Sequence, residues 1–495
     1  MNEIVYSTIT IIFATISYCI AWRYFLRNNT KFAVYYLIIG GLILRIYTSS
    51  DNYLHEWDER YHSLVAKNLI KHPLKPTLYE KPVLPYDYKD WTSNHIWIHK
   101  PPLPLWAMAI SMSIFGINEF AIRIPSIILS SLSILILLGI GRYFYNDRIA
   151  FLACYFFSIN GLIIELTAGR VATDHIDIFL MFFIELAILF SILFVQTQKS
   201  IFNVLAGMST AAAILSKWLV ALIVIPIWIL ILLDSNKFSP KKIIKHFLVL
   251  VSTCLALSLP WQIYIYTAFS NEAKWETSFN FKHFTEVLEN QTGSIFYYVN
   301  KIRINYGELI YLAIIYFLYK LKASHYDKKR LALLVWFLLP IIIFSFAKTK
   351  MQAYIVFVSP ALFLITSEFY FYINESEHHF KYLWLPKIIL FLIIILPIRY
   401  MIERTKLFSN ENRHPQWVRS LKKLNNEVSQ NTIIFNYDRP IEAMFYTNVI
   451  VYSQIPDTTK LKELNQQGYE IILIEKPDLP EYYRKIKIIK TLTIE

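Results

Sequence analysis

The sequence predicts an all-α polytopic membrane protein that carries a small α/β domain at its C-terminus. Three observations lead to this prediction. The 495 residues are 55% hydrophobic and only 17% charged, whereas a soluble chain carries about 25% charged residues. Long apolar runs alternate with short charged ones, as membrane spans and loops do. After about residue 403 the alternation stops and mostly polar sequence follows.

The apolar runs predict about twelve transmembrane helices, each judged against the ~20 residues that cross the hydrocarbon core. The first run is too long for a typical signal-peptide core and lacks a basic stretch before it, so we expect it to be a retained span. The expected spans cover residues 4–26, 32–50, 121–144, 149–168, 178–195, 201–216, 218–233, 247–266, 303–320, 331–347, 353–372 and 386–402.

The charges between the spans predict the orientation. Under strict alternation the strongly basic loops all fall on one side, which the positive-inside rule makes cytoplasmic. Their basic residues are Arg23, Arg27, Lys31, Arg142, Arg148, Lys237, Lys241, Lys242, Lys245, Lys320, Lys322, Lys328, Lys329, Arg330, Lys381 and Lys387. The extracytoplasmic side then receives the C-terminal tail and the loops near 51–120, 169–177, 267–302 and 348–352.

The tail contains two β-like runs, at 432–435 and 470–474, with helical patterns around 415–429 and 457–467. We therefore predict a transmembrane domain over 1–402 and a small extracytoplasmic α/β domain over 403–495.

The net charge of +13 does not indicate a nucleic-acid partner. The basic residues form short clusters between apolar runs instead of one soluble basic face, so the expected partner is the membrane lipid. Cys19, Cys154 and Cys254 lie inside apolar runs, where cysteine is usually a small buried hydrophobe. Their spacing predicts neither a disulfide framework nor a metal site.

The first outer loop contains the most informative polar residues. Asp58 and Glu59 form an acidic pair directly after a span, which suits a general base that takes a proton from an attacking hydroxyl or amine. The alternative is a solvated pair of loop charges. Lys100 precedes two prolines, which present it on a stiff segment where it suits a phosphate. Alternatively, Lys100 is an ordinary lysine near the end of a span, whose ammonium reaches the membrane–water interface.

A second acidic candidate is Asp174, which lies in another outer loop just before an apolar run. It could divide the catalytic work with the first acidic pair, or it could simply cap the helix that follows. Lys217, Lys348 and Lys350 lie on the outer side against the positive-inside bias. Outer cations at headgroup depth indicate a lipid phosphate, with interfacial lysines as the alternative.

No cofactor is predicted with certainty. The sequence lacks a serine-hydrolase elbow, a P-loop and a Rossmann glycine pattern. His55, His62, His95 and His99 lie in or near the first outer loop, so a divalent metal stays open, but their spacing matches no ligand signature.

An ordered set of short segments between about 51 and 360 resembles the C-type membrane glycosyltransferases. Within that class the likeness is to the lipid A aminoarabinose transferases and the protein O-mannosyltransferases. The segments are Asp58-Glu59-Arg60-Tyr61, Lys100-Pro101-Pro102-Leu103, Phe115-Gly116, Arg123-Ile124-Pro125-Ser126, Thr173-Asp174, Leu215-Ser216-Lys217, Leu259-Pro260-Trp261, and Lys350 with Tyr354 and Pro360.

The resemblance implies an inverting enzyme. Such enzymes transfer one sugar from a polyprenyl-phosphate donor to a lipid, glycan or protein acceptor at the outer face of the membrane. Lysine- and isoleucine-rich composition favours a bacterial inner membrane and undecaprenyl phosphate as the carrier. The resemblance also implies surface-lying helices between about 94 and 120.

The resemblance further implies roles for single residues. Asp58 would be the base, with Glu59 and Asp174 as the other catalytic carboxylates. Lys100, Lys350, Tyr354 and Lys217 would bind the donor phosphate, and Arg60, Tyr61 and His99 would support the site. The sequence departs from the family at His99, because a glutamate often precedes the Lys-Pro-Pro segment.

Two other functions remain alternatives. A transporter or flippase for a lipid-linked saccharide would carry polar residues near the middle of its spans. A non-catalytic membrane subunit would lose nothing in sugar transfer when Asp58 is changed.

Overall fold

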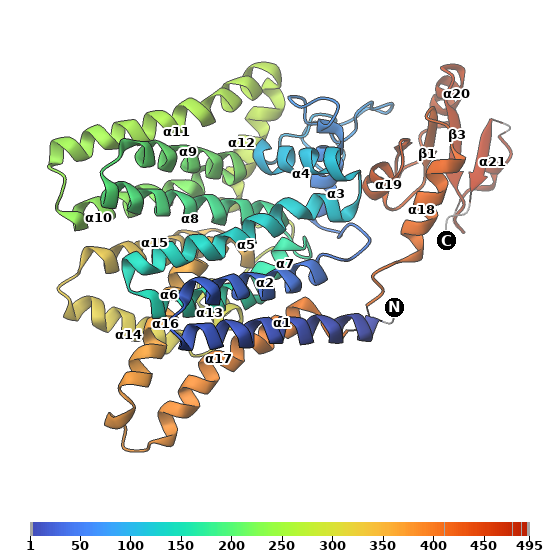
Figure 1. Ribbon diagram of the computed structural model, residues 1–495. Helices are drawn as coiled ribbons and strands as arrows, with labels where there is room; N and C mark the ends of the chain where they lie inside the picture. The colour runs from blue at the N-terminus through green and yellow to red at the C-terminus, as the bar shows by residue number, and fades with distance from the viewer. Residues whose placement is uncertain (1–2, 410, 478, 487, 493–495) are drawn as a thin grey trace. The chain divides into compact units, whose positions relative to one another are not determined.

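The protein folds into two compact units, each assembled from segments far apart in the sequence (Figure 1). The computed structural model describes residues 3–409, 411–477, 479–486 and 488–492. The first unit comprises Met1–Ser49, Ser126–Ala268 and Thr277–Asn410, and the second comprises Ser50–Pro125, Phe269–Glu276 and Glu411–Glu495. Residues of α5 (Glu119–Phe144) and α12 (Ser270–Thr285) belong to both.

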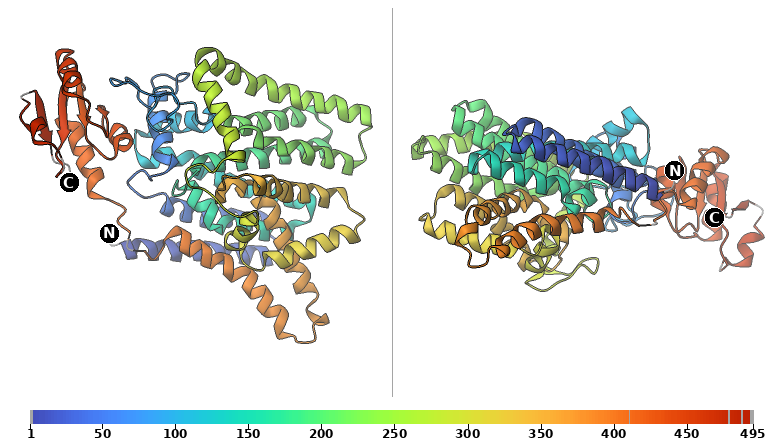
Figure 2. Two further views of the ribbon diagram at one scale, coloured as in Figure 1. Left: turned by 180° about the vertical axis from the view of Figure 1, so that it is seen from behind. Right: turned by 60° about the horizontal axis from the view of Figure 1, so that its bottom comes forward.

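The first unit is a bundle of long apolar helices that run side by side in all views (Figures 1 and 2). Within the described ranges, nine helical segments are long and apolar enough to cross a membrane, or ten if one bent pair counts as a span. The helices are α1 (Glu3–Leu26), α2 (Thr30–Thr48), α6 (Asp147–Ile159), α7 (Gly161–Thr167), α8 (Asp174–Thr197), α9 (Ser200–Lys217), α10 (Val224–Ser235), α11 (Pro240–Ala268), α13 (Tyr297–Tyr306), α14 (Ile310–Ala323), α15 (Lys328–Phe346), α16 (Ser359–Glu375) and α17 (Trp384–Thr405), with 3-10 turns η1 (Trp218–Ile223), η2 (Gln352–Val358) and η3 (Glu377–His379).

These helices confirm a polytopic membrane protein, while the count of about twelve spans stays a prediction. Two expected spans differ in detail. The span at 149–168 is the pair α6 and α7, bent by 52° at Asn160, whose side chain accepts the Ile163 N–H and so starts α7. The helix expected at 303–320 is instead divided between α13 and α14, because Gly307 adopts φ +92°, which ends α13.

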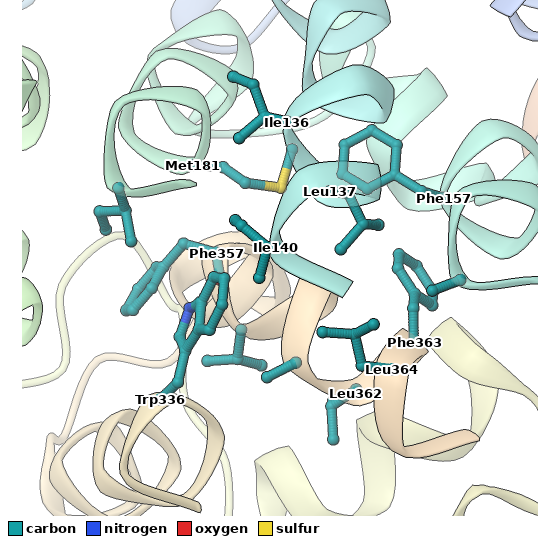
Figure 3. Close-up of a cluster of buried hydrophobic side chains, with 14 of the residues drawn as sticks. Ile136, Leu137, Ile140, Phe157, Met181, Trp336, Phe357, Leu362, Phe363 and Leu364 are labelled. Carbon is teal, nitrogen blue, oxygen red and sulfur yellow. The ribbon is translucent and has the colours of Figure 1, made fainter. Parts of the chain in front are cut away.

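A hydrophobic cluster to which several helices contribute holds the first unit together (Figure 3). Trp336 of α15 is fully buried, and its indole N–H donates to the carbonyl of Phe357 in η2 at 2.9 Å. Such a bond satisfies the one polar atom of a large apolar side chain. The cluster also includes Ile136, Leu137 and Ile140 of α5, Phe157 of α6, and Leu362, Phe363 and Leu364 of α16.

The second unit contains a small parallel sheet in the order β2-β1-β3-β4. Its strands are β1 (Thr432–Phe435), β2 (Ile450–Val451), β3 (Glu470–Ile474) and β4 (Ile489–Leu492), and its helices are α3 (Asp58–Leu69), α4 (Pro102–Phe115), α18 (Gln416–Glu427), α19 (Pro440–Tyr446), α20 (Thr458–Gln466) and α21 (Glu481–Arg484). Both expected strands and both expected helical stretches of the tail are therefore confirmed. In the range 94–120, where surface-lying helices are expected, the structure has α4, which with its 14 residues is too short to span. α3 precedes that range.

The first outer loop and the C-terminal tail share one hydrophobic core. Leu54, Val65 and Trp97 from the loop belong to the same buried cluster as Phe435 and Leu473 from the sheet. The two compact units therefore do not coincide with the ranges 1–402 and 403–495, and that division into domains stays a prediction.

Lys67 joins α3 to the C-terminal helix α19. Its ammonium donates to the carbonyls of Met444 at 2.7 Å, Phe445 at 2.9 Å and Thr447 at 2.6 Å. These are carbonyls at the end of α19 that have no partner within the helix, and three bonds use every donor of the ammonium.

Replacing Lys67 by Met should loosen α19. The variant removes charge-assisted bonds and leaves helix-end carbonyls without partners, so we expect a loss of about 2 kcal/mol in local stability. Hydrogen exchange of the peptide that covers residues 440–447 measures this loss. Lys71→Met is the control, because that lysine is exposed and pairs with Glu80 at 3.1 Å, away from the carbonyls of α19. Equal exchange in the Lys67 variant and the parent would contradict the capping role.

Candidate active site

The first acidic candidate stands at the beginning of a helix. Asp58 is the first residue of α3, where the helix dipole stabilises a carboxylate. Lys100 directly precedes Pro101, and the prolines there start α4. The Lys100 ammonium lies 3.5 Å from the Asp58 carboxylate, and the two side chains are only 20% and 14% exposed. The structure thus brings a carboxylate and a cation together at the ends of two rigid helices.

Glu59, one residue on, is fully buried and has both oxygens engaged. Arg123 donates to them at 2.7 Å and 2.9 Å, and the backbone N–H of His55 donates at 2.7 Å. Arg123 also donates to the carbonyls of Asp51 and Tyr53, at 2.5 Å and 2.7 Å. These bonds fix the conformation of the loop before α3. Of the acidic pair, Asp58 is therefore the carboxylate that is partly exposed, at 14%.

Arg60 and Tyr61 are linked to the C-terminal segment through Glu442. Arg60 donates to Glu442 at 3.2 Å and to the Tyr61 hydroxyl at 3.3 Å. Burial raises the pKa of Tyr61 above its ordinary value, although the Arg60 charge opposes the shift. The phenol therefore stays protonated at neutral pH and supports its neighbours by hydrogen bonding.

His99 lies in an aromatic setting next to an acid that the sequence did not point to. Its ring stacks on Trp91 with centroids 4.7 Å apart, and its Nδ1 lies 2.9 Å from the carboxylate of Glu276 in α12. Glu276, which is 177 residues further along the chain, thus places a carboxylate directly beside His99. In the described ranges no three His, Cys, Asp or Glu side chains are placed to hold a metal ion.

In the first unit, Asp174 is the first residue of α8 and is completely buried. Its carboxylate accepts the Ile176 N–H at 3.4 Å, as a helix-start residue does. Thr173 and Asp174 both adopt positive φ, +71° and +33°. Left-handed backbone is costly for such residues and is concentrated at functional sites.

Lys217 has a partner that sequence reasoning missed. Its ammonium lies 2.5 Å from the carboxylate of Asp177 and 4.8 Å from the ring centre of Tyr354. Asp177 is fully buried and lies one turn after Asp174 on α8. Lys217 and Asp177 are forty residues apart, so no local pattern connects them. The i,i+3 spacing of Asp174 and Asp177 is the sequence signal that could have pointed to Asp177.

Lys350 belongs to the short segment before η2. It is 4% exposed, and its ammonium donates to the carbonyl of Ala347. Burial and the nearby charge of Lys348 lower the pKa of Lys350 below its ordinary value. An anion beside this ammonium would offset both effects, which makes Lys350 a suitable phosphate ligand.

The described site residues therefore form two clusters. The first, called the α3 cluster, lies in the second unit and consists of Asp58, Glu59, Arg60, Tyr61, His99 and Lys100 with Arg123 and Glu276. The other, called the α8 cluster, comprises the site residues of the first unit, Asp174, Asp177, Lys217, Lys350 and Tyr354. Lys217 contacts Asp177 and Tyr354, while Lys350 is included because it lies in the same unit, in the segment before η2.

Comparison with known proteins defines a class. Residues 99–264 match the family model for dolichyl-phosphate-mannose-protein mannosyltransferase. The apo crystal structure of ArnT from Cupriavidus metallidurans has a TM-score of 0.63 at 14% identity and covers 91% of this chain and 93% of its own. The same protein bound to undecaprenyl phosphate has a TM-score of 0.59 at 12% identity, with 87% of each chain covered. The fold is that of the C-type membrane glycosyltransferases.

The particular likeness is to the aminoarabinose and mannosyl transferases, as the ordered segments predicted. An undecaprenyl phosphate-alpha-4-amino-4-deoxy-L-arabinose arabinosyl transferase 2 from Pseudomonas fluorescens is 25% identical over 284 residues, which cover 54% of this chain and 46% of the relative. An uncharacterized protein from Aquifex aeolicus is 24% identical over 343 residues, covering 67% and 63%. The chain thus matches about half to two thirds of the length of these relatives.

Proposed function

We propose that the chain is an inverting glycosyltransferase. It moves a single sugar from a polyprenyl-phosphate donor to a lipid, glycan or protein acceptor of the cell envelope. The observation that carries this proposal is the Asp58–Lys100 pair, 3.5 Å apart at the starts of two helices. A base and a phosphate ligand side by side are the two groups that such a displacement needs.

In the reaction, Asp58 accepts the proton of the acceptor hydroxyl or amine. The freed electron pair attacks the anomeric carbon from the side opposite the phosphate. The bond between that carbon and the phosphate oxygen breaks, and the oxygen leaves with the bonding pair as polyprenyl phosphate. Lys100 stabilises the negative charge that develops there. A single displacement of this kind inverts the anomeric configuration.

The remaining residues take the roles that the resemblance implies. Lys350, Tyr354 and Lys217 contact the donor phosphate, and Asp174 binds donor or acceptor. Lys217 already pairs with Asp177, so its charge is partly neutralised and Lys350 is the stronger phosphate ligand of the α8 cluster.

We further propose a bacterial inner membrane, with the C-terminal segment and the site residues on the extracytoplasmic side. The loop charges support this orientation. Undecaprenyl phosphate is the proposed carrier, in keeping with the carrier named for the ArnT crystal structure and the Pseudomonas relative.

Lys100→Ala should weaken donor binding by about ten- to a hundredfold, the cost of one bond to a charged group. The KM for the acceptor should hardly change. Native mass spectrometry with undecaprenyl phosphate measures the affinity. Lys423→Ala is the control, because that lysine is 79% exposed and its ion pair with the neighbouring Glu427 is long, at 3.6 Å. Unchanged affinity in the Lys100 variant would remove its phosphate role.

One observation favours the transporter alternative. Glu185 lies fully buried at the middle of α8, and an ionisable group at that depth often marks a transport path. Proteoliposomes loaded with a lipid-linked sugar separate the two functions. A transporter moves the intact lipid between leaflets, whereas the proposed enzyme leaves the sugar on an acceptor and the phosphate on the lipid.

A further inference from the structure

A pocket in the first unit belongs to neither cluster of site residues. It lies among the loop between α5 and α6 and the helices α14, α15 and α16, and its volume is about 290 Å³. The polar residues on its wall are Asn146, Arg148, Tyr316, Lys320, Arg330, Glu368, Tyr372 and Glu375.

The pocket lies at the end of the bundle that the loop charges make cytoplasmic. α5 and α14 end there, α6 and α15 begin there, and α16 ends there at Glu375. Tyr354 of the α8 cluster precedes the opposite end of α16. With its 17 residues, α16 spans about 25 Å. The part of the pocket at Glu375 therefore lies a full helix length from the end of α16 that Tyr354 precedes.

The floor of the pocket is an ion pair that is already satisfied. Arg330 donates to both oxygens of Glu368, at 2.5 Å and 3.0 Å, and the Tyr145 hydroxyl donates to the same carboxylate at 2.9 Å. These contacts neutralise both charges within the fold. The floor thus gives the pocket its shape and leaves ligand binding to the rim.

The cations of the rim are Arg148 and Lys320. In the part of the chain that the structure describes, neither side chain makes an ion pair within the protein. Arg148 is exposed in the second position of α6, where the Asn146 side chain already caps the helix start, so the guanidinium is the group that can meet an anion. Arg148 and Lys320 together suit a phosphate.

The pocket also carries groups that attract a cation. Tyr316 and Tyr372 stack with their centroids 4.3 Å apart, and both line the pocket together with the exposed carboxylate of Glu375. Aromatic faces and a carboxylate attract an ammonium group. Tyrosines are also enriched at headgroup depth. A pocket lined by two cations that form no ion pair with a described residue, an exposed acid and two aromatic rings matches a zwitterion.

We propose that this pocket binds the phosphoethanolamine headgroup of a lipid in the cytoplasmic leaflet. Arg148 and Lys320 hold the phosphate, while Glu375 and the two tyrosines hold the ammonium. The site is independent of the proposed sugar transfer, because it lies at the other end of α16.

Native mass spectrometry of the delipidated full-length protein tests the proposal. We expect phosphatidylethanolamine to bind at least tenfold more tightly than phosphatidylglycerol, which shares the phosphate and lacks the ammonium. Arg148→Ala combined with Lys320→Ala should weaken phosphatidylethanolamine binding at least tenfold. Glu375→Gln should reduce the preference for phosphatidylethanolamine and leave phosphatidylglycerol binding unchanged.

Lys322→Ala is the matched control, since Lys322 lies on the same helix and outside the pocket wall. Thermal unfolding checks that the variants fold, which we expect because the changed cations make no ion pair inside the protein. Equal affinity for the two lipids, or unchanged binding in the double variant, would overturn the proposal. Equally tight binding of soluble glycerophosphoethanolamine would also overturn it, because the ligand would then be a free phosphate ester.

Discussion

Asp58→Asn is expected to lower kcat/KM for sugar transfer at least about a hundredfold, because the amide cannot accept the acceptor's proton. The side chain keeps its size and its position at the start of α3. Donor affinity should hold or rise slightly, since Lys100 loses a competing anion 3.5 Å away. Initial rates in detergent with a polyprenyl-phosphate sugar measure the change.

The control for this variant is Glu56→Gln. Glu56 lies in the same loop, its side chain is 73% exposed, and its ion pair with Arg439 is long, at 3.6 Å. Glu56→Gln removes one negative charge from the same loop, and the rate of sugar transfer should stay unchanged. Transfer at the parent's rate by Asp58→Asn would show that Asp58 is not the base and would favour the non-catalytic alternative.

Arg123→Met should be the most destabilising single change in the α3 cluster. It leaves the Glu59 carboxylate buried without its main cation, which typically costs about 3–5 kcal/mol. The carbonyls of Asp51 and Tyr53 also lose a donor. We expect a lower midpoint of thermal unfolding and faster hydrogen exchange in residues 51–59.

The double variant Arg123→Met with Glu59→Met separates the charge effect from the loss of packing. Replacing both members of a buried ion pair by apolar groups is often neutral, so much of the stability should return. The recovery should be incomplete, because the two loop carbonyls still lack their donor. If the double variant is no more stable than Arg123→Met alone, the buried charge is not the source of the loss.

The sequence predicted what depends on local pattern. The long apolar runs became helices, and the β-like runs at 432–435 and 470–474 became β1 and β3. β2 has only two residues, and the middle of β4 is polar, with Lys490 and Thr491, so neither leaves a pattern distinct from a loop. Their place in the sheet is set by pairing with distant strands.

Side-chain contacts between residues far apart in the sequence could not be predicted from local patterns either. Lys217 is 40 residues from Asp177, and His99 is 177 residues from Glu276. The sequence could identify single candidate residues such as Asp58 and Lys100, from their neighbours in the chain and from the resemblance to a known family. It could not show that Arg123 and His55 already occupy the carboxylate of Glu59.

The most direct measurement of the central claim is mass spectrometry of the cell envelope from a strain that lacks the gene. Complementation with the parent and with Asp58→Asn completes the comparison. The proposed function predicts a lipid, glycan or protein that is lighter by one sugar in the deletion strain, restored by the parent and not by Asp58→Asn. Identical envelope masses in the deletion and parent strains would contradict it.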